Sequence, residues 1–185
     1  MSSSIETIFA TLRKGGAKRL PDAPEGILRH GLVAAAHARD AGAVPDMIVA
    51  ALLHDIGHLL DLDDDDGFDD DRDVEHAALG AAWLSLWLPE TVTRPIGLHV
   101  DAKRYMARDA RFIDALTPMS RASLGLQGGP HMDAEAAIFE REAYFADALR
   151  VRTWDDAPDL ADARIGTLED YGALIEGLLS PFRRR

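Results

Sequence analysis

Four histidines and two aspartates occur along the chain in an order that could bind two metal ions. His54 and Asp55 are adjacent in AALLHDIGHLLD, and the other candidates lie in segments with helical periodicity. The ordered set is His30, His54, Asp55, His76, His99 and Asp156. Nitrogen and carboxylate donors without thiolates suit iron, manganese or zinc better than a soft-metal site. One structural zinc ion uses fewer donors than this set provides, so the pattern favours two metals.

The position of Asp55 on its helix predicts a shared ligand. It follows His54 directly, so its carboxylate lies about 100° further around a helix and could bridge two ions. The segment RTWDD ends the series with two consecutive aspartates, Asp155 and Asp156. These are also about 100° apart on a helix, so only one of them should face the metals. We expect Asp156 to be that ligand.

Two further polar residues lie one helical turn from predicted ligands. His58 follows His54 on the same face, about 6 Å further along the axis, where it could contact a substrate or belong to the core. Lys103 follows His99 by four residues and faces the same way. It is either an ordinary ion-pair partner or a cation that binds an anionic substrate, since lysine suits phosphate-like groups.

A glycine-rich segment from Ser123 to Met132 reads SLGLQGGPHM. Its Gly128-Gly129-Pro130 sequence predicts a sharp turn after a short helix. Backbone N–H groups in such a turn could bind an oxyanion, or the turn could simply connect two elements. Of the remaining histidines, His37 is expected to be structural and His131 to lie on the surface.

The composition limits both the class of protein and its partners. The 185 residues suit one domain spanning 1–185, and the absence of cysteine excludes disulfides, thiolate metal sites and a cysteine nucleophile. The sequence has no signal-peptide core and no run of about 18 apolar residues, so we expect a cytoplasmic protein without a membrane segment. A net charge of −12 argues against nucleic-acid binding and requires local cations for any anionic substrate.

Nearly every apolar pattern has a helical period, so the sequence predicts an all-α fold. The expected helices span residues 3–13, 25–41, 46–60, 74–88, 91–106, 109–115, 118–126, 133–142, 144–156 and 168–179. The segment 61–73 contains nine aspartates, but their spacing does not fit an EF-hand. We expect this segment to be a solvated loop that its own charge keeps extended.

Four segments together resemble the HD-domain superfamily: LLHDIGH, HAALGAAWLSLWLPETVTRPIGLHVDAKRYM, SLGLQGGP and RTWDD. More closely, they are similar to its PhnZ-like branch of mixed-valent diiron oxygenases, which cleave the C–P bond of hydroxylated aminophosphonates. The similarity covers about residues 25–160, and LHVDAKRY and LQGGP are its most specific parts. It implies an HD-domain helical bundle with a dinuclear site at its centre, two iron ions (Fe(II) and Fe(III)), and O₂ as a co-substrate.

The resemblance also implies roles for individual residues. One iron would bind His30, His54, Asp55 and Asp156, and the other would bind Asp55, His76 and His99. The family's substrate lysine matches Lys103, and the histidine of its HD helix matches His58, so these two are the expected catalytic and substrate-contacting residues. The other expected substrate-binding residues are Ser120, Ser123 and Gln127.

The chain departs from the family pattern on the side that recognises the substrate's amine. Relatives with primary-amine substrates carry a Tyr and a Glu some seven to ten residues before the first ligand, where this chain has Leu20 and Ala23. Glu25 is acidic but nearer the ligand. Thr153 stands where an arginine is common, although Arg152 is adjacent. The substrate is therefore expected to differ, as a quaternary ammonium or a non-amino hydroxyphosphonate.

Three functions follow from these patterns. The favoured one is a diiron oxygenase that uses O₂ to cleave the C–P bond of a small 1-hydroxyphosphonate, derived from 2-aminophosphonates or related to them, with release of phosphate. The second is a metal-dependent HD phosphohydrolase acting on a nucleotide or phosphoester, and the third is a non-catalytic HD module. The complete donor set disfavours the third, and four histidines disfavour a mononuclear hydrolase. The expected partner is a small-molecule organophosphonate, and the expected assembly is a monomer or small homo-oligomer.

Overall fold

The computed structural model describes residues 4–19, 25–60 and 70–179, and within these ranges the chain is helical, with no β-strand. The prediction of an all-α fold is therefore confirmed. The elements are α1 (Ser4–Gly15), α2 (Ile27–Asp40), α3 (Pro45–Leu53), the 3₁₀ helix η1 (Ile56–Leu59), α4 (Asp70–Leu84), α5 (Glu90–Met106), α6 (Ala110–Ala115), α7 (Pro118–Leu126), α8 (Asp133–Phe139), α9 (Phe145–Asp155), α10 (Asp162–Ile165), the 3₁₀ helix η2 (Leu168–Tyr171) and α11 (Gly172–Leu178). None of the helices in these ranges combines the length and apolar composition that crossing a bilayer requires.

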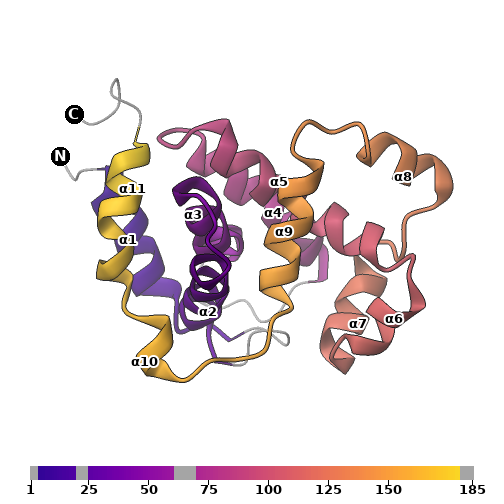
Figure 1. Ribbon diagram of the computed structural model, residues 1–185, viewed down its shortest axis with the longest axis horizontal. Helices are drawn as coiled ribbons and strands as arrows, with labels where there is room; N and C mark the ends of the chain where they lie inside the picture. Colours follow the sequence, from indigo (N-terminus) through magenta and orange to yellow (C-terminus); the bar gives the residue numbers. More distant parts are fainter. Residues whose placement is uncertain (1–3, 20–24, 61–69, 180–185) are drawn as a thin grey trace.

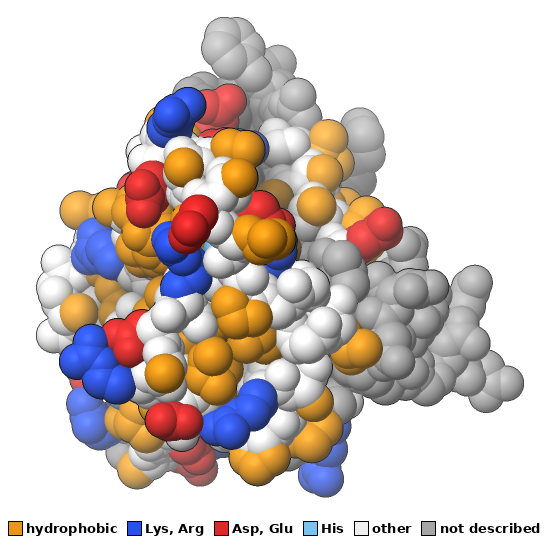
Figure 2. All heavy atoms as spheres, turned by 90° about the vertical axis from the view of Figure 1, so that its right-hand side faces the viewer, with side chains coloured by type: hydrophobic (Ala, Val, Ile, Leu, Met, Phe, Trp, Pro, Cys, Tyr) orange, Lys and Arg blue, Asp and Glu red, His pale blue; other side chains and the backbone are white. Residues whose placement is uncertain are grey.

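The helices α2 and α3 pack against each other, α9 packs against both of them, and α5 packs against α3 and α9 (Figure 1). α4 packs along α5 and against η1. α1 and α11 contact each other at one end, whereas α6, α7 and α8 form the other end. On the face that this second end presents in Figure 2, basic and acidic side chains are interspersed, with apolar side chains between them.

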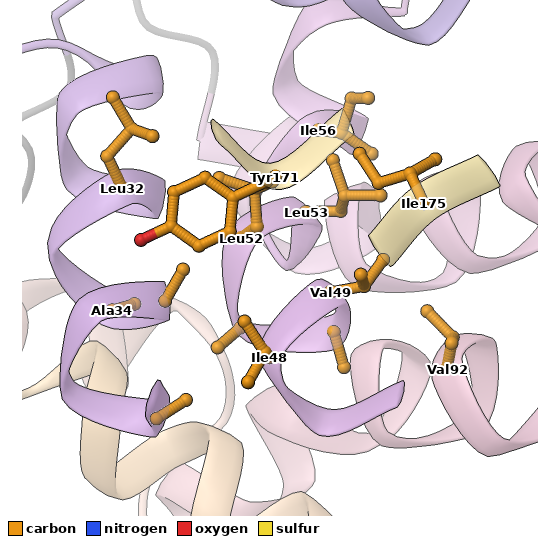
Figure 3. Packing of buried hydrophobic residues seen from close by; sticks show 14 of the residues in the cluster. Leu32, Ala34, Ile48, Val49, Leu52, Leu53, Ile56, Val92, Tyr171 and Ile175 are labelled. Atoms are coloured by element: carbon orange, nitrogen blue, oxygen red, sulfur yellow. The ribbon is translucent and has the colours of Figure 1, made fainter. Parts of the chain in front are cut away.

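The central helix α3 carries apolar residues all the way round its axis, which is the pattern of a helix enclosed by others. All seven residues from Met47 to Leu53 are buried. Figure 3 shows Val49 and Leu53 of α3 packed against Ile175 of α11. Tyr171 adds its ring to the same cluster, and its hydroxyl donates a hydrogen bond to the Ile165 carbonyl (3.0 Å). The C-terminal elements η2 and α11 therefore pack against α3, the helix that ends directly before His54.

Several elements differ from those expected. The predicted helix over 46–60 ends at Leu53, and Asp55 has φ −98° and ψ 7°, outside the α-helical range, before η1 begins. α4 spans Asp70–Leu84 instead of residues 74–88. It begins earlier because aspartates are favourable at a helix N-terminus, and it ends at Leu84, before a turn. The short helix α10 was not among the expected helices. Residues 61–69, most of the acidic segment, lie outside the described residues.

A close backbone approach places η1 against α4. A Cβ atom added to Gly57 would lie 1.9 Å from the His76 carbonyl oxygen and 3.0 Å from the Gly80 backbone nitrogen. Both contacts are with backbone, which cannot swing aside as a flexible side chain can. Only glycine at residue 57 allows the chain just after His54-Asp55 to approach the helix that carries His76.

We expect Gly57→Ala to lower the free energy of unfolding by at least the roughly 1–3 kcal/mol that overpacking typically costs. Thermal and urea unfolding of the two proteins would measure the difference. Gly177→Ala is the matched control, because an added Cβ there meets nothing within 4 Å on an exposed helical turn. The control should be neutral or more stable by about 0.5–1 kcal/mol, since alanine is favoured over glycine in a helix. Equal stability of Gly57→Ala and the unmodified protein would contradict the close approach.

Candidate metal centre

Six donor side chains meet in two adjacent clusters at the centre of the bundle. The first cluster contains His30, His54 and Asp155, and the second contains Asp55, His76 and His99. The donor atoms of each cluster lie within 4.8 Å of one another. α2, the end of α3 and α9 supply the first cluster, whereas the α3–η1 junction, α4 and α5 supply the second. The structure therefore brings together five of the six predicted ligands, with a neighbour of the sixth.

The first cluster is built around one oxygen of Asp155. Its Oδ1 atom lies 2.9 Å from Nε2 of His30 and 3.4 Å from Nε2 of His54. On the opposite side of its ring, His30 has Nδ1 3.3 Å from Oε1 of Glu25. A carboxylate on the far nitrogen of a ligating imidazole fixes the tautomer and the ring orientation. Glu25 therefore leaves Nε2 of His30 to face the cluster.

Asp55 lies between the two clusters and presents one carboxylate oxygen to each. Its Oδ2 atom is 3.3 Å from Nε2 of His54 and 3.9 Å from Nε2 of His30. Its Oδ1 atom is 3.5 Å from Nε2 of His76 and 3.7 Å from Nε2 of His99. This arrangement suits a bridging ligand. It arises because the chain leaves the α-helix directly after His54, not from the helical offset that the sequence analysis assumed.

The imidazoles are oriented for ligation by backbone carbonyls. Nδ1 of His54 lies 2.9 Å from the Ala51 carbonyl oxygen, and Nδ1 of His99 lies 2.7 Å from that of Ile96. When Nδ1 donates to these carbonyls, Nε2 keeps its lone pair for a cation. Nε2 of His54 is fully buried and has no hydrogen-bond partner among the described residues. A buried nitrogen of this kind, among carboxylates and other imidazoles, fits a hard or borderline metal ion.

The electrostatics of the first cluster favour a bound positive charge. Although burial raises the pKa of the Asp55 and Asp155 carboxyls, charged neighbours hold both well below their usual range, with His54 acting on each and Arg152 on Asp155. Burial lowers the pKa of His30, but hydrogen bonds to Asp155 and Glu25 outweigh this effect and raise it to about 10. Two ionised carboxylates therefore attract either protons or a metal cation to the imidazoles.

The prediction that Asp156 faces the metals differs from the structure, which places Asp155 there. Asp155 lies three residues after Arg152 and Asp156 four residues after it, and both carboxylates contact its guanidinium. Nε of Arg152 donates to Oδ2 of Asp156 at 2.6 Å, and Asp156 belongs to neither donor cluster. The helix α9 can turn only one of two consecutive side chains toward the histidines. No sequence signal separates the two aspartates, because one arginine three or four residues earlier can reach both of them.

Of the predicted substrate residues, His58 contacts the second cluster directly, whereas Lys103, Ser123 and Gln127 are buried side chains. The ring of His58 stacks on that of His76, with 3.9 Å between centroids and 18° between planes. Burial, together with the charge of His76, lowers the pKa of His58 to about 3, so this imidazole is neutral. Lys103 is 1% exposed, and its Nζ atom donates to Oγ of Ser123 at 3.2 Å. Gln127 is also buried, in the turn that follows α7.

A cavity of about 320 Å³ opens beside the first cluster. It is lined by Glu25, His30, Met106, Phe112, Ala115, Leu116, Thr117, Ser120, Arg152, Thr153, Asp155, Asp156 and Ala157. The Ser120 hydroxyl is buried in its wall and has no hydrogen-bond partner among the described residues. Phe112, Leu116 and Thr117 could not be predicted as lining residues, because apolar residues and threonines in or next to short helices form no recognisable sequence motif. The cavity combines a polar side near the donors with an apolar side from α6.

His37 and His131 belong to neither donor cluster, and only one of the two expectations for them agrees with the structure. Nε2 of His37 lies 2.8 Å from the Pro158 carbonyl oxygen, as a structural residue would. His131 was expected on the surface, but it is 6% exposed and lies 3.2 Å from Asp101. Its ring packs edge-on against Phe139, which explains why a residue after a glycine-rich turn is buried.

Comparison with known proteins identifies relatives that cover most of the chain. A hydroxymethylphosphonate dioxygenase of Gimesia maris is 38% identical over 154 residues, which are 82% of this chain and 77% of the relative. A [1-hydroxy-2-(trimethylamino)ethyl]phosphonate dioxygenase (glycine-betaine-forming) of Leisingera caerulea is 34% identical, over 95% of this chain and 90% of the relative. An uncharacterized protein of Acanthamoeba polyphaga mimivirus is 28% identical over 96% of this chain and 82% of its own length. No family model matches the chain.

The two dioxygenases exceed the identity and coverage at which common descent is secure, and the His and Asp residues of the HD segment meet in the structure as that relationship requires. The chain therefore belongs to the PhnZ-like branch of the HD-domain superfamily, the branch that contains these phosphonate dioxygenases.

Proposed function

We propose that this protein is a dioxygenase that uses O₂ to cleave the C–P bond of a small 1-hydroxyphosphonate. The observation that carries the proposal is the position of Asp55, with one oxygen toward each of two donor clusters beside a cavity. The relatives named as phosphonate dioxygenases support the reaction class. The balanced reaction converts the substrate carbon to a carboxylic acid and releases phosphate, with both atoms of one O₂ entering the products.

The proposed cofactor is a pair of iron ions, Fe(II) and Fe(III), held by the two clusters. The first ion would take His30, His54, Asp155 and one oxygen of Asp55, and the second would take His76, His99 and the other oxygen of Asp55. When bound, such ions supply Lewis acidity toward the substrate's oxygens and the electrons for O₂ activation. The donor set supports iron, since imidazole and carboxylate ligands without sulfur suit it.

The protein's own groups would bind the phosphonate from two sides. Lys103 is a buried cation held by Ser123, and a buried lysine binds a phosphate-like anion as a point charge. Ser120 adds a buried hydroxyl on the cavity side. His58 and Gln127 are proposed to complete the polar lining, His58 as a neutral hydrogen-bonding group. This cation and the hydrogen-bond donors around it would offset the substrate charge in a protein of net charge −12.

The cavity wall favours a substrate without a primary amine. Met106, Phe112 and Leu116 offer apolar and aromatic contacts, and the nearby carboxylate of Glu25 is already engaged by His30. A methylated ammonium group needs no hydrogen-bond acceptor and is attracted to an aromatic face. The names of the two dioxygenase relatives specify substrates that lack a primary amine. Leu20 and Ala23 lie outside the described residues.

The reaction class predicts that phosphate release from hydroxymethylphosphonate or its trimethylaminoethyl analogue requires O₂, with one phosphate formed per O₂ consumed. An oxygen electrode and a phosphate assay on the same iron-loaded sample would measure both quantities. 2-Aminoethylphosphonate carrying the 1-hydroxyl group is the matched substrate control, and we expect it to be turned over less efficiently. Equal phosphate yield under strict anaerobiosis would contradict the oxygenase, and release of phosphate from a nucleotide or phosphoester in the same assay would favour the metal-dependent phosphohydrolase.

The cluster geometry predicts two metal ions per chain in anaerobically purified, iron-loaded protein. Asp55→Ala should lose both ions, because its two oxygens face different clusters, whereas His99→Ala should keep one. Elemental analysis after gel filtration would give the ratio of iron to protein. His37→Ala, outside both clusters, should retain two ions. A single ion in the unmodified protein would contradict the dinuclear site.

Lys103→Met should weaken substrate binding without changing metal content, because methionine keeps an unbranched side chain but removes the charge. Losing a charge-assisted hydrogen bond typically costs about 1.5–3 kcal/mol, which is roughly a tenfold to hundredfold rise in Kd. Substrate titration of the anaerobic protein would measure Kd. Lys14→Met, an exposed lysine on α1, should leave Kd unchanged. An unaltered Kd in Lys103→Met would exclude this residue from substrate binding.

A further inference from the structure

We propose that Arg152 and Asp156 form a positioning pair that fixes the Asp155 carboxylate for metal binding, an inference that rests on the proposed metal site. The three residues lie within one turn of α9 and its C-terminal cap. In this arrangement the two consecutive aspartates of RTWDD differ in role. Asp155 faces the histidines, whereas Asp156 binds the guanidinium of Arg152, which in turn binds Asp155.

The contacts of Asp155 divide its two oxygens between a metal side and a protein side. Nη1 of Arg152 lies 2.6 Å from Oδ2 of Asp155. The other oxygen, Oδ1, is the one that approaches His30 and His54. The guanidinium therefore occupies one oxygen and prevents the carboxylate from rotating about its Cβ–Cγ bond. Only Oδ1 is left to ligate a metal.

Asp156 engages the other two nitrogens of the same guanidinium. Nε of Arg152 donates to Oδ2 of Asp156 at 2.6 Å, and Nη2 contacts Oδ1. This two-point contact matches the planar fork of arginine to a carboxylate and restricts both groups to one geometry. Asp156 thus determines where Nη1 of Arg152 points, and it does so without contacting the histidines of the first cluster.

The burial of these three side chains makes the loss of any one partner costly. The Arg152 side chain is 7% exposed, and the side chains of Asp155 and Asp156 are 9% and 21% exposed. A buried charge that loses a partner is strongly disfavoured, so the guanidinium would seek another contact. Arg152 also lines the cavity beside the first cluster, so it could turn toward that space. Asp155 would then lose the contact that restricts its rotation.

The helix supplies the required spacing. Side chains three and four residues apart lie on neighbouring positions of a helical surface, so one arginine can reach both aspartates that follow it. The same helix carries a second arginine–aspartate pair, Asp147 and Arg150, with 3.8 Å between their charged atoms and side chains 37% and 45% exposed. Asp147 also lies outside both donor clusters. It provides a control that removes one negative charge from α9 without touching the proposed pair.

The experiment titrates metal-free protein with Co(II), in competition with a chelator, and records the d–d absorption of each bound ion. The unmodified protein should bind two ions. Loss of an outer partner typically reduces metal affinity 10–100-fold, so Asp156→Ala should bind two ions with one Kd raised by about that factor and an altered absorption band. Asp155→Ala should lose one ion, and Asp147→Ala should keep both affinities within about twofold.

Two conservative variants separate positioning from charge and from misfolding. Asp156→Asn keeps an acceptor oxygen for Arg152, so it should restore part of the affinity that Asp156→Ala loses. Arg152→Lys keeps the charge but cannot contact both carboxylates through one planar group, so it should weaken the same ion as Asp156→Ala. Circular dichroism of the metal-free variants would show that each is folded.

Each contrary outcome is distinct. Unchanged Co(II) affinity in Asp156→Ala would exclude the positioning role while leaving the metal site intact. Loss of a whole ion in Asp156→Ala, with both ions retained in Asp155→Ala, would make Asp156 the ligand and overturn the pair. If the unmodified protein bound no Co(II), the metal site and this inference would both be wrong. A folded protein that binds two ions but releases no phosphate from hydroxyphosphonates would refute only the proposed reaction.

Discussion

The carboxylate of Asp55 imposes the strictest constraint on this fold, because four histidines must approach one buried anion from different helices. Desolvating a charge is expensive unless partners are placed with good geometry, so the surrounding helices have little freedom to shift. The close approach of Gly57 to the His76 backbone and the enclosure of α3 follow from this requirement. The C-terminal elements around Tyr171 and Ile175 then complete the hydrophobic support of α3.

The sequence was sufficient to predict the helical class, most helix positions and five of the six clustered donors. Helical periodicity is a local property, and histidines spaced along apolar helix faces point toward a common interior. The sequence did not predict where the helix of the HD segment ends. Asp55 lies between the two clusters, and the helix ends after Leu53 instead of at residue 60. Tertiary contacts decided that boundary.

The choice between Asp155 and Asp156 shows a second limit of local reasoning. Helical geometry required that only one aspartate face the histidines, but it did not say which one. That choice depends on the rotation of α9 against α2 and α5, and on the buried guanidinium of Arg152, whose position on the helix reaches both carboxylates. The residues of the cavity wall could not be predicted either, because Phe112 and Leu116 line the same cavity as His30 only through the packing of α6.

The long sequence separation within the first cluster has a consequence for how the protein is made. His30 and Asp155 are hydrogen-bonded although they lie 125 positions apart in the sequence. During synthesis this cluster cannot exist until α9 has emerged from the ribosome and packed against α2. Contacts of such separation form late in folding, since closing a long loop costs entropy before the contact is gained. Under the proposed metal site, the first cluster would bind its ion only after α9 has packed against α2, so that ion would stabilise a bundle that is already assembled instead of nucleating its folding.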